Sequence, residues 1–136
     1  MVKTAIEVSK DWLSTAEMSS KMGLYEQSLY AMEMSVEIAF KAVLRSLSIE
    51  FPKVHDITDA AREYLSGNGK LPGGFREGLQ DYIATFNSLL GYRPIVGYGF
   101  DERFQNVDFE EKAKRLLPKS KEVVLACEAA IKKMRR

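Results

Sequence analysis

His55 is the only histidine among the 136 residues, and it is the side chain best suited to moving a proton. An imidazole changes charge near neutral pH and can serve as a general base. The nearest upstream arginine, Arg45, lies ten positions away, and no motif supplies His55 with an obvious partner. Two interpretations are therefore open. His55 is either a catalytic base or a residue that caps and orients the turn before the next helix.

A second group of chemically capable side chains lies in the irregular segment 91–107. Arginine can bind phosphate through paired hydrogen bonds, and aromatic rings can stack on bases. The segment holds both kinds of residue: Tyr92, Arg93, Tyr98, Arg103 and Phe104. It is not a phosphate-binding loop of the P-loop type, because it lacks the downstream Lys-Ser/Thr. Either the segment binds a nucleotide, or its aromatic side chains fold back onto the rest of the protein.

Composition limits the other kinds of site. Cys127 is the sole cysteine, which excludes an internal disulfide and a cysteine-based zinc site, and no His-Glu-x-x-His motif occurs. We therefore expect no metal and no cofactor. Lys and Arg number 20 against 19 Asp and Glu, and this net charge of +1 does not indicate a nucleic-acid-binding protein. No apolar run is long enough for a signal peptide or a membrane span, so we expect a cytoplasmic protein.

The elements that must position these residues are helices. Hydrophobic residues make up 46% of the chain and recur at steps of three and four, with no sustained alternation typical of strands. We predict one all-α domain over residues 1–136, an up-down bundle of four to five helices. The predicted helices span 4–22, 25–48, 57–65, a segment between Gly74 and Gly91, and a segment from Asp108 onward.

Particular residues predict where these helices begin, end and pack. In the first helix, Ala5, Val8, Trp12 and Ala16 form the expected buried stripe, and Gly23 marks the end. Asp56 and Asp108 are the expected N-caps of the third and last helices, and Gly91 is the expected C′ residue of the fourth. Pro118 is expected to kink the last helix or to split it in two.

The second helix is apolar on two faces. Its main stripe is Leu29, Met32, Val36, Ala39, Phe40, Val43 and Leu47. Tyr30, Met34 and Ile38 lie on another face, which indicates either a central helix of the bundle or a homodimer interface. Glu33, Glu37, Lys41 and Arg45 form a row at steps of four. We expect Glu37 and Lys41 to be a solvent-exposed ion pair.

These residues, taken in order, resemble the HEPN family of helical domains. The matching pieces are Trp12-Leu13 with Ala16, Gly23-Leu24-Tyr25, the Glu37-x-x-x-Lys41-Ala42 pattern, Pro52 with His55-Asp56-Ile57, and Arg103-Phe104 before the last helix. The resemblance implies a four- or five-helix up-down bundle that often forms a homodimer. It also implies nucleotide binding, frequent pairing with a small nucleotidyltransferase encoded alongside, and a role in toxin–antitoxin pairs.

Chemistry and resemblance together nominate Lys41, His55, Arg93 and Arg103 as nucleotide-binding residues. Some HEPN relatives are ribonucleases that use an arginine followed four to six residues later by a histidine, and this chain lacks that pair. We therefore expect a binding and interaction protein. The alternative is an RNA-cleaving or nucleotide-processing enzyme that uses His55 with Arg45 or Arg103.

Overall fold

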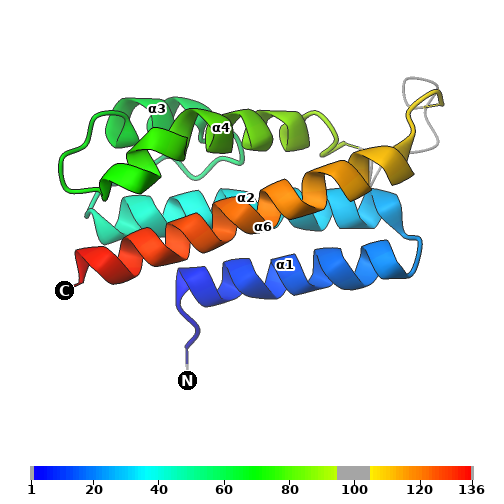
Figure 1. Ribbon diagram of the computed structural model, residues 1–136, viewed down its shortest axis with the longest axis horizontal. Helices are drawn as coiled ribbons and strands as arrows, with labels where there is room; N and C mark the ends of the chain where they lie inside the picture. The colour runs from blue at the N-terminus through cyan, green and yellow to red at the C-terminus, as the bar shows by residue number, and fades with distance from the viewer. Residues whose placement is uncertain (1, 95–104, 136) are drawn as a thin grey trace.

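A computed structural model describes residues 2–94 and 105–135, and these residues form helices and no strand. The helices are α1 (Ala5–Lys21), α2 (Tyr25–Ser46), α3 (Thr58–Leu65), α4 (Gly73–Leu90) and α6 (Phe109–Met134). The four long helices alternate in direction along the bundle, and the short α3 lies in the connection from α2 to α4 (Figure 1). The predicted all-α up-down bundle is thus confirmed.

Helix α2 is the centre of the bundle, because it contacts each of the other four helices. With α6 it lies between α1 on one side and α3 and α4 on the other (Figure 1). Its predicted stripe is buried from Leu29 to Val43, and Leu47 is half-buried. Phe40 meets Phe86 of α4 edge to face, with ring centroids 5.8 Å apart. The interpretation of α2 as a central helix therefore holds.

The face that α1 buries differs from the prediction. Ser9, Leu13 and Ala16 are buried, whereas Trp12 is only half-buried. Ser9 can enter the interface because its hydroxyl donates a hydrogen bond of 2.6 Å to the carbonyl of Ser35 on α2. Hydropathy alone favours the large apolar side chain, but small serines let two helices pack closely.

Left-handed residues end both α1 and α2. Gly23 has φ +76°, and the amide of Leu24 reaches back to the carbonyl of Ser19, as in a Schellman motif. Ser48 repeats this arrangement with φ +56° after α2, which ends at Ser46, two residues before the predicted end. A serine is strained there, because a Cβ disfavours the left-handed region.

Of three further predictions about helix ends, two are wrong and one is confirmed. Asp56 accepts a hydrogen bond from the Thr58 amide, but Ile57 occupies the N-cap position of α3. Gly91 ends α4 in a right-handed conformation with φ −62°, so it does not act as a left-handed C′ residue. Asp108 caps α6 as predicted, through the amide of Glu111.

Pro118 does not split the last helix, because α6 continues from Phe109 to Met134. A proline inside a helix removes one backbone hydrogen bond and clashes with the preceding turn. Leu116 and Val123 are buried on either side of Pro118, so core packing stabilises the helix on both sides of the proline. Across the described residues, no helix has the length and apolar character needed to cross a membrane.

Candidate functional site

Two glutamates on α2 are buried in the bundle. Glu33 is fully buried, and the side chain of Glu37 is only 3% exposed. Glu37 Oε2 accepts a 2.9 Å hydrogen bond from Lys41 Nζ, whose side chain is 20% exposed. The pair therefore forms as expected, but the prediction of a solvent-exposed pair is wrong. Helices and turns packed around α2 cover this face.

Arg93 reaches these glutamates from the turn that follows α4. Its amide donates to the carbonyl of Leu90, which continues the helical path of the backbone. Nη1 then lies 2.7 Å from Glu33 Oε2 and 3.3 Å from the sulfur of Met34. The guanidinium carbon lies 5.2 Å from the centroid of the Tyr30 ring, in cation–π range. The side chain of Arg93 is thus held between a carboxylate and an aromatic ring.

His55 joins the same group from the segment between α2 and α3. Its Nδ1 lies 3.2 Å from Glu37 Oε1, and its Nε2 lies 2.8 Å from Arg93 Nη2. A guanidinium has donors only, so Nε2 of His55 must accept the hydrogen bond from Arg93. Nδ1 must then carry the proton and donate a hydrogen bond to Glu37. This geometry assigns the neutral Nδ1–H tautomer to His55, with its lone pair occupied by Arg93.

We call Glu33, Glu37, Lys41, His55 and Arg93 the polar cluster. Burial and the neighbouring Glu37 carboxyl raise the pKa of Glu33 from 4.5 to about 8, although Arg93 opposes the shift. Glu33 Oε1 is buried with no hydrogen-bond partner among the described residues. The raised pKa keeps Glu33 largely protonated near neutral pH. Such strongly perturbed carboxyls are typical of functional sites.

The structure brings three of the four nominated nucleotide-binding residues together, namely Lys41, His55 and Arg93. The fourth, Arg103, lies outside the described residues, as do Tyr98 and Phe104. Tyr92 is half-buried and packs against the core, as expected if the aromatic residues of segment 91–107 fold back. Tyr30 and Met34, two of the nominated dimer residues, contact Arg93, and Ile38 is half-buried one turn further along α2.

Sequence reasoning missed Glu33 and Glu37 as functional residues. The available signal was their spacing of four residues on a helix whose other faces are almost entirely apolar. On a central helix, every face is covered by another element. Two acids on one such face must then meet cations or hold protons, because an unpaired buried charge is costly.

A basic hollow adjoins the polar cluster where the N-terminal end of α1, the later turns of α2 and residues 51–55 meet. Its volume is about 430 Å³, which is within the range of small-molecule sites. The polar side chains that line it are Lys3, Lys41, Arg45, Lys53 and His55. Its apolar lining is Ala5, Val8, Ile38, Phe51 and Val54. No carboxylate from the described part of the chain lines it.

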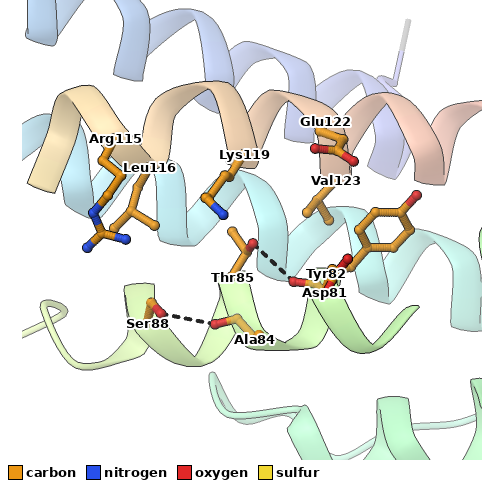
Figure 2. A pocket seen from close by; sticks show the side chains of 10 residues that line it. All are labelled: Asp81, Tyr82, Ala84, Thr85, Ser88, Arg115, Leu116, Lys119, Glu122 and Val123. Carbon is orange, nitrogen blue, oxygen red and sulfur yellow. Dashed lines mark hydrogen bonds between the residues drawn. The ribbon is translucent and has the colours of Figure 1, made fainter. Parts of the chain in front are cut away.

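A smaller groove of about 250 Å³ between α4 and α6 has mixed charge (Figure 2). Asp81 and Glu122 line it together with Arg115 and Lys119. The hydroxyls of Thr85 and Ser88 donate to carbonyls of their own helix, as for Thr85 and Asp81 at 3.1 Å. The groove therefore lacks the uniform positive charge of the basic hollow.

Cys127 is buried on α6. Burial raises the pKa of the Cys127 thiol, which favours the neutral, unreactive form. Within residues 2–94 and 105–135, no group of three or more His, Cys, Asp and Glu side chains is placed to hold a metal ion. The chemistry of the polar cluster is that of cations, carboxyls and one imidazole.

The family model of the HEPN domain matches residues 2–130, nearly the whole chain. The chain belongs to the HEPN family. No curated protein matched it. Membership in the family indicates, in general terms, a function related to nucleotides or RNA.

Proposed function

We propose that this HEPN protein binds a nucleotide through a phosphate group held at the polar cluster. The observation that carries the proposal is the meeting of Arg93, His55 and Lys41 at one partly open position. The side chain of His55 is 55% exposed, whereas the glutamates behind it are buried. A ligand from solvent therefore reaches the imidazole and the guanidinium first.

Exchange of hydrogen bonds at Arg93 supports phosphate binding. Nη2 of Arg93 donates to the neutral Nε2 of His55 at 2.8 Å. A phosphate oxygen carries negative charge and accepts a stronger hydrogen bond from a guanidinium than a neutral imidazole does. A phosphate placed against Nη2 would compete with His55 for this donor, while Nη1, the other nitrogen of the planar fork, donates to Glu33.

A thermal-shift titration with nucleoside mono-, di- and triphosphates tests the proposal. Ligand binding to the folded state increases the free energy of unfolding, by about 2.7 kcal/mol at a concentration 100 times Kd, and so raises the melting temperature. We expect the shift in the parent protein and its loss in Arg93→Ala and His55→Ala, each compared with its own ligand-free form. Arg76→Ala removes an exposed arginine of α4 and is the matched control. An unchanged shift in both site variants would contradict the proposal.

The protein is also proposed to be a homodimer and the partner of a small nucleotidyltransferase, in a toxin–antitoxin pair. The half-buried apolar side chains of Tyr30, Met34 and Ile38 on one face of α2 support the dimer, and a second copy on this face would lie next to the polar cluster. Co-expression with a nucleotidyltransferase encoded beside this gene, followed by size-exclusion chromatography, tests the partnership. Separate elution of the two proteins at micromolar concentration would contradict it.

RNA cleavage is the second candidate function, and the contact between Arg93 and His55 favours it. The chain lacks a short-spaced Arg-His pair, yet the fold joins an arginine and a histidine that are 38 residues apart. Once Arg93 turns to the phosphate, Nε2 of His55 is free to take the proton of a ribose 2′-hydroxyl. The 2′-oxygen then attacks phosphorus, the bond to the 5′-oxygen breaks, and that oxygen receives a proton from His55.

Incubation of a labelled single-stranded RNA with the protein tests this second candidate. The expected products end in a 2′,3′-cyclic phosphate, and His55→Ala is expected to form at least 100-fold less of them. A 2′-deoxy strand of the same sequence is the control, because it lacks the attacking hydroxyl. Equal cleavage by the parent and by His55→Ala would exclude His55 as the base.

A further inference from the structure

The basic hollow continues the positive charge of the polar cluster along one face of α2. Arg93 binds at the level of Glu33, and Lys41 pairs with Glu37. Arg45 lies four residues after Lys41, on the next turn of the same face, and lines the hollow with it. The chain as a whole carries a net charge of only +1, so this concentration of positive charge is local.

Two of the cations that line the basic hollow have no carboxylate partner in the described part of the chain. Lys3 pairs with Asp11 and Lys41 pairs with Glu37. Arg45 and Lys53, in contrast, form no ion pair with a carboxylate of the described residues, although both line the hollow. An anion placed between them would therefore gain electrostatic energy without displacing an internal partner.

Apolar and aromatic groups accompany the cations. Phe51 is half-buried in the hollow, and Lys41 Nζ lies 5.8 Å from the centroid of its ring. The exposed imidazole of His55 supplies a second ring at the end nearest the polar cluster. Cations that follow a backbone, together with rings on which bases stack, are the usual composition of a site for single-stranded nucleic acid.

We propose that the basic hollow is a strand-binding subsite in which Arg45 and Lys53 hold phosphates that follow, along the strand, the one held at the polar cluster. Unpaired cations and aromatic rings share the lining of the hollow, which suits a ligand that carries both phosphates and bases along its length. The ligand class is thus a single-stranded oligonucleotide, and the inference rests on the proposed phosphate site at Arg93 and His55.

The limits of the subsite follow from its charges. An adjoining hollow of about 600 Å³ shares Arg45, Phe51 and Lys53, but it also contains the exposed Glu50. A carboxylate repels a phosphate backbone, so the cationic lining ends at Glu50. The strand therefore runs from the polar cluster past Lys41 toward Arg45 and Lys53.

Fluorescence anisotropy with a labelled single strand tests this subsite in the full chain. The probe is an oligonucleotide of about ten nucleotides with 2′-O-methyl sugars, a length within the site sizes known for single strands and a chemistry that prevents cleavage. The variant pair Arg45→Ala and Lys53→Ala removes the two unpaired cations. The matched control removes Lys119 and Lys121, two exposed lysines of α6 that do not line the hollow.

We expect the Arg45/Lys53 double variant to bind the strand roughly tenfold more weakly at low salt, with a slope of log Kd against log salt reduced by about 1.4. That reduction corresponds to the loss of two phosphate contacts at about 0.7 each. The Lys119/Lys121 double variant should bind like the parent. An unchanged slope in the Arg45/Lys53 variant, an equal loss in the control, or no strand binding by the parent would overturn the inference.

A second readout separates this inference from the proposed function. If the parent shows thermal shifts with mononucleotides but does not bind the strand, the subsite is wrong and the phosphate site at Arg93 stands. If the Arg45/Lys53 variant loses strand binding while Arg93→Ala and His55→Ala keep it, the subsite stands and the proposed function fails.

Discussion

Nη2 of Arg93 lies 2.8 Å from Nε2 of His55, although the two residues are 38 positions apart in the chain. Because the guanidinium only donates, it occupies the one lone pair that the neutral imidazole offers. His55 is thereby kept from acting as a base until Arg93 finds another acceptor. Under the proposed function, the arrival of a phosphate would be the event that releases the imidazole.

Removal of Arg93 is expected to destabilise the protein in a pH-dependent way. Arg93→Ala leaves Glu33 buried without its cation, and breaking such a pair costs about 3 kcal/mol where the carboxyl is ionised. At pH 6 the raised pKa of Glu33 lets it hold a proton, so the cost should be smaller there than at pH 9. Urea unfolding at both pH values measures the difference. Arg76→Ala should change stability by less than about 0.5 kcal/mol at either pH.

The buried carboxyl of Glu33 is expected to make stability fall as pH rises. Its pKa is about 8 in the folded protein against 4.5 in the unfolded chain, so between these values the folded state binds the extra proton. Raising pH through this window therefore favours unfolding, by up to about 1.4 kcal/mol per pH unit. The stabilisation from the proton on Glu33 is fully present below pH 4.5 and is lost above pH 8.

Glu33→Gln is the control for that pH dependence. The amide keeps an acceptor for Arg93 but cannot ionise, so this variant should show a flatter stability profile from pH 5 to pH 8. Chemical denaturation at four pH values in this range provides the comparison. Parallel profiles for the variant and the parent would assign the pH dependence to other groups.

The left-handed residue after α2 predicts a stabilising substitution. Ser48 has φ +56°, where a Cβ costs roughly 1 kcal/mol, and glycine is the usual residue of a Schellman motif. Ser48→Gly should raise the free energy of unfolding by about 0.5 kcal/mol, after allowance for the greater flexibility of glycine when unfolded. Gly23→Ala, the opposite change at the equivalent position of α1, should lower it. Destabilisation by Ser48→Gly would show that its side chain makes a favourable contact.

The proposed homodimer predicts the mass of the protein in solution. The chain has a mass of 15.4 kDa, and light scattering at micromolar concentration should give about twice this value. Ile38→Gln places a polar group in the half-buried patch with Tyr30 and Met34 and should shift the mass toward that of the monomer. Met18→Gln, at an exposed methionine of α1, should leave the mass unchanged. A monomeric parent would contradict the dimer.

Several features of the fold were predictable because they depend on residues close in sequence. The step of three and four residues identified the buried stripe of α2 from Leu29 to Val43. Local hydrogen bonds at Gly23 and Asp108 decided where α1 ends and α6 begins. The predicted split at Pro118 did not occur for the complementary reason, since packing of distant residues outweighs one missing backbone hydrogen bond.

The properties of the candidate site likewise divide into those that the sequence determined and those that only the tertiary structure decided. By itself, the sequence determined the helical class, the resemblance to HEPN domains, and the chemical types of Lys41, His55 and Arg93. Only the tertiary structure decided that Glu33 and Glu37 are buried and that Arg93 lies between Glu33 and His55. Helical periodicity specifies which side chains share a face of α2, but the element that covers that face depends on how the whole bundle packs. Burial, pairing and protonation follow from that packing, and so does the chemistry of the site.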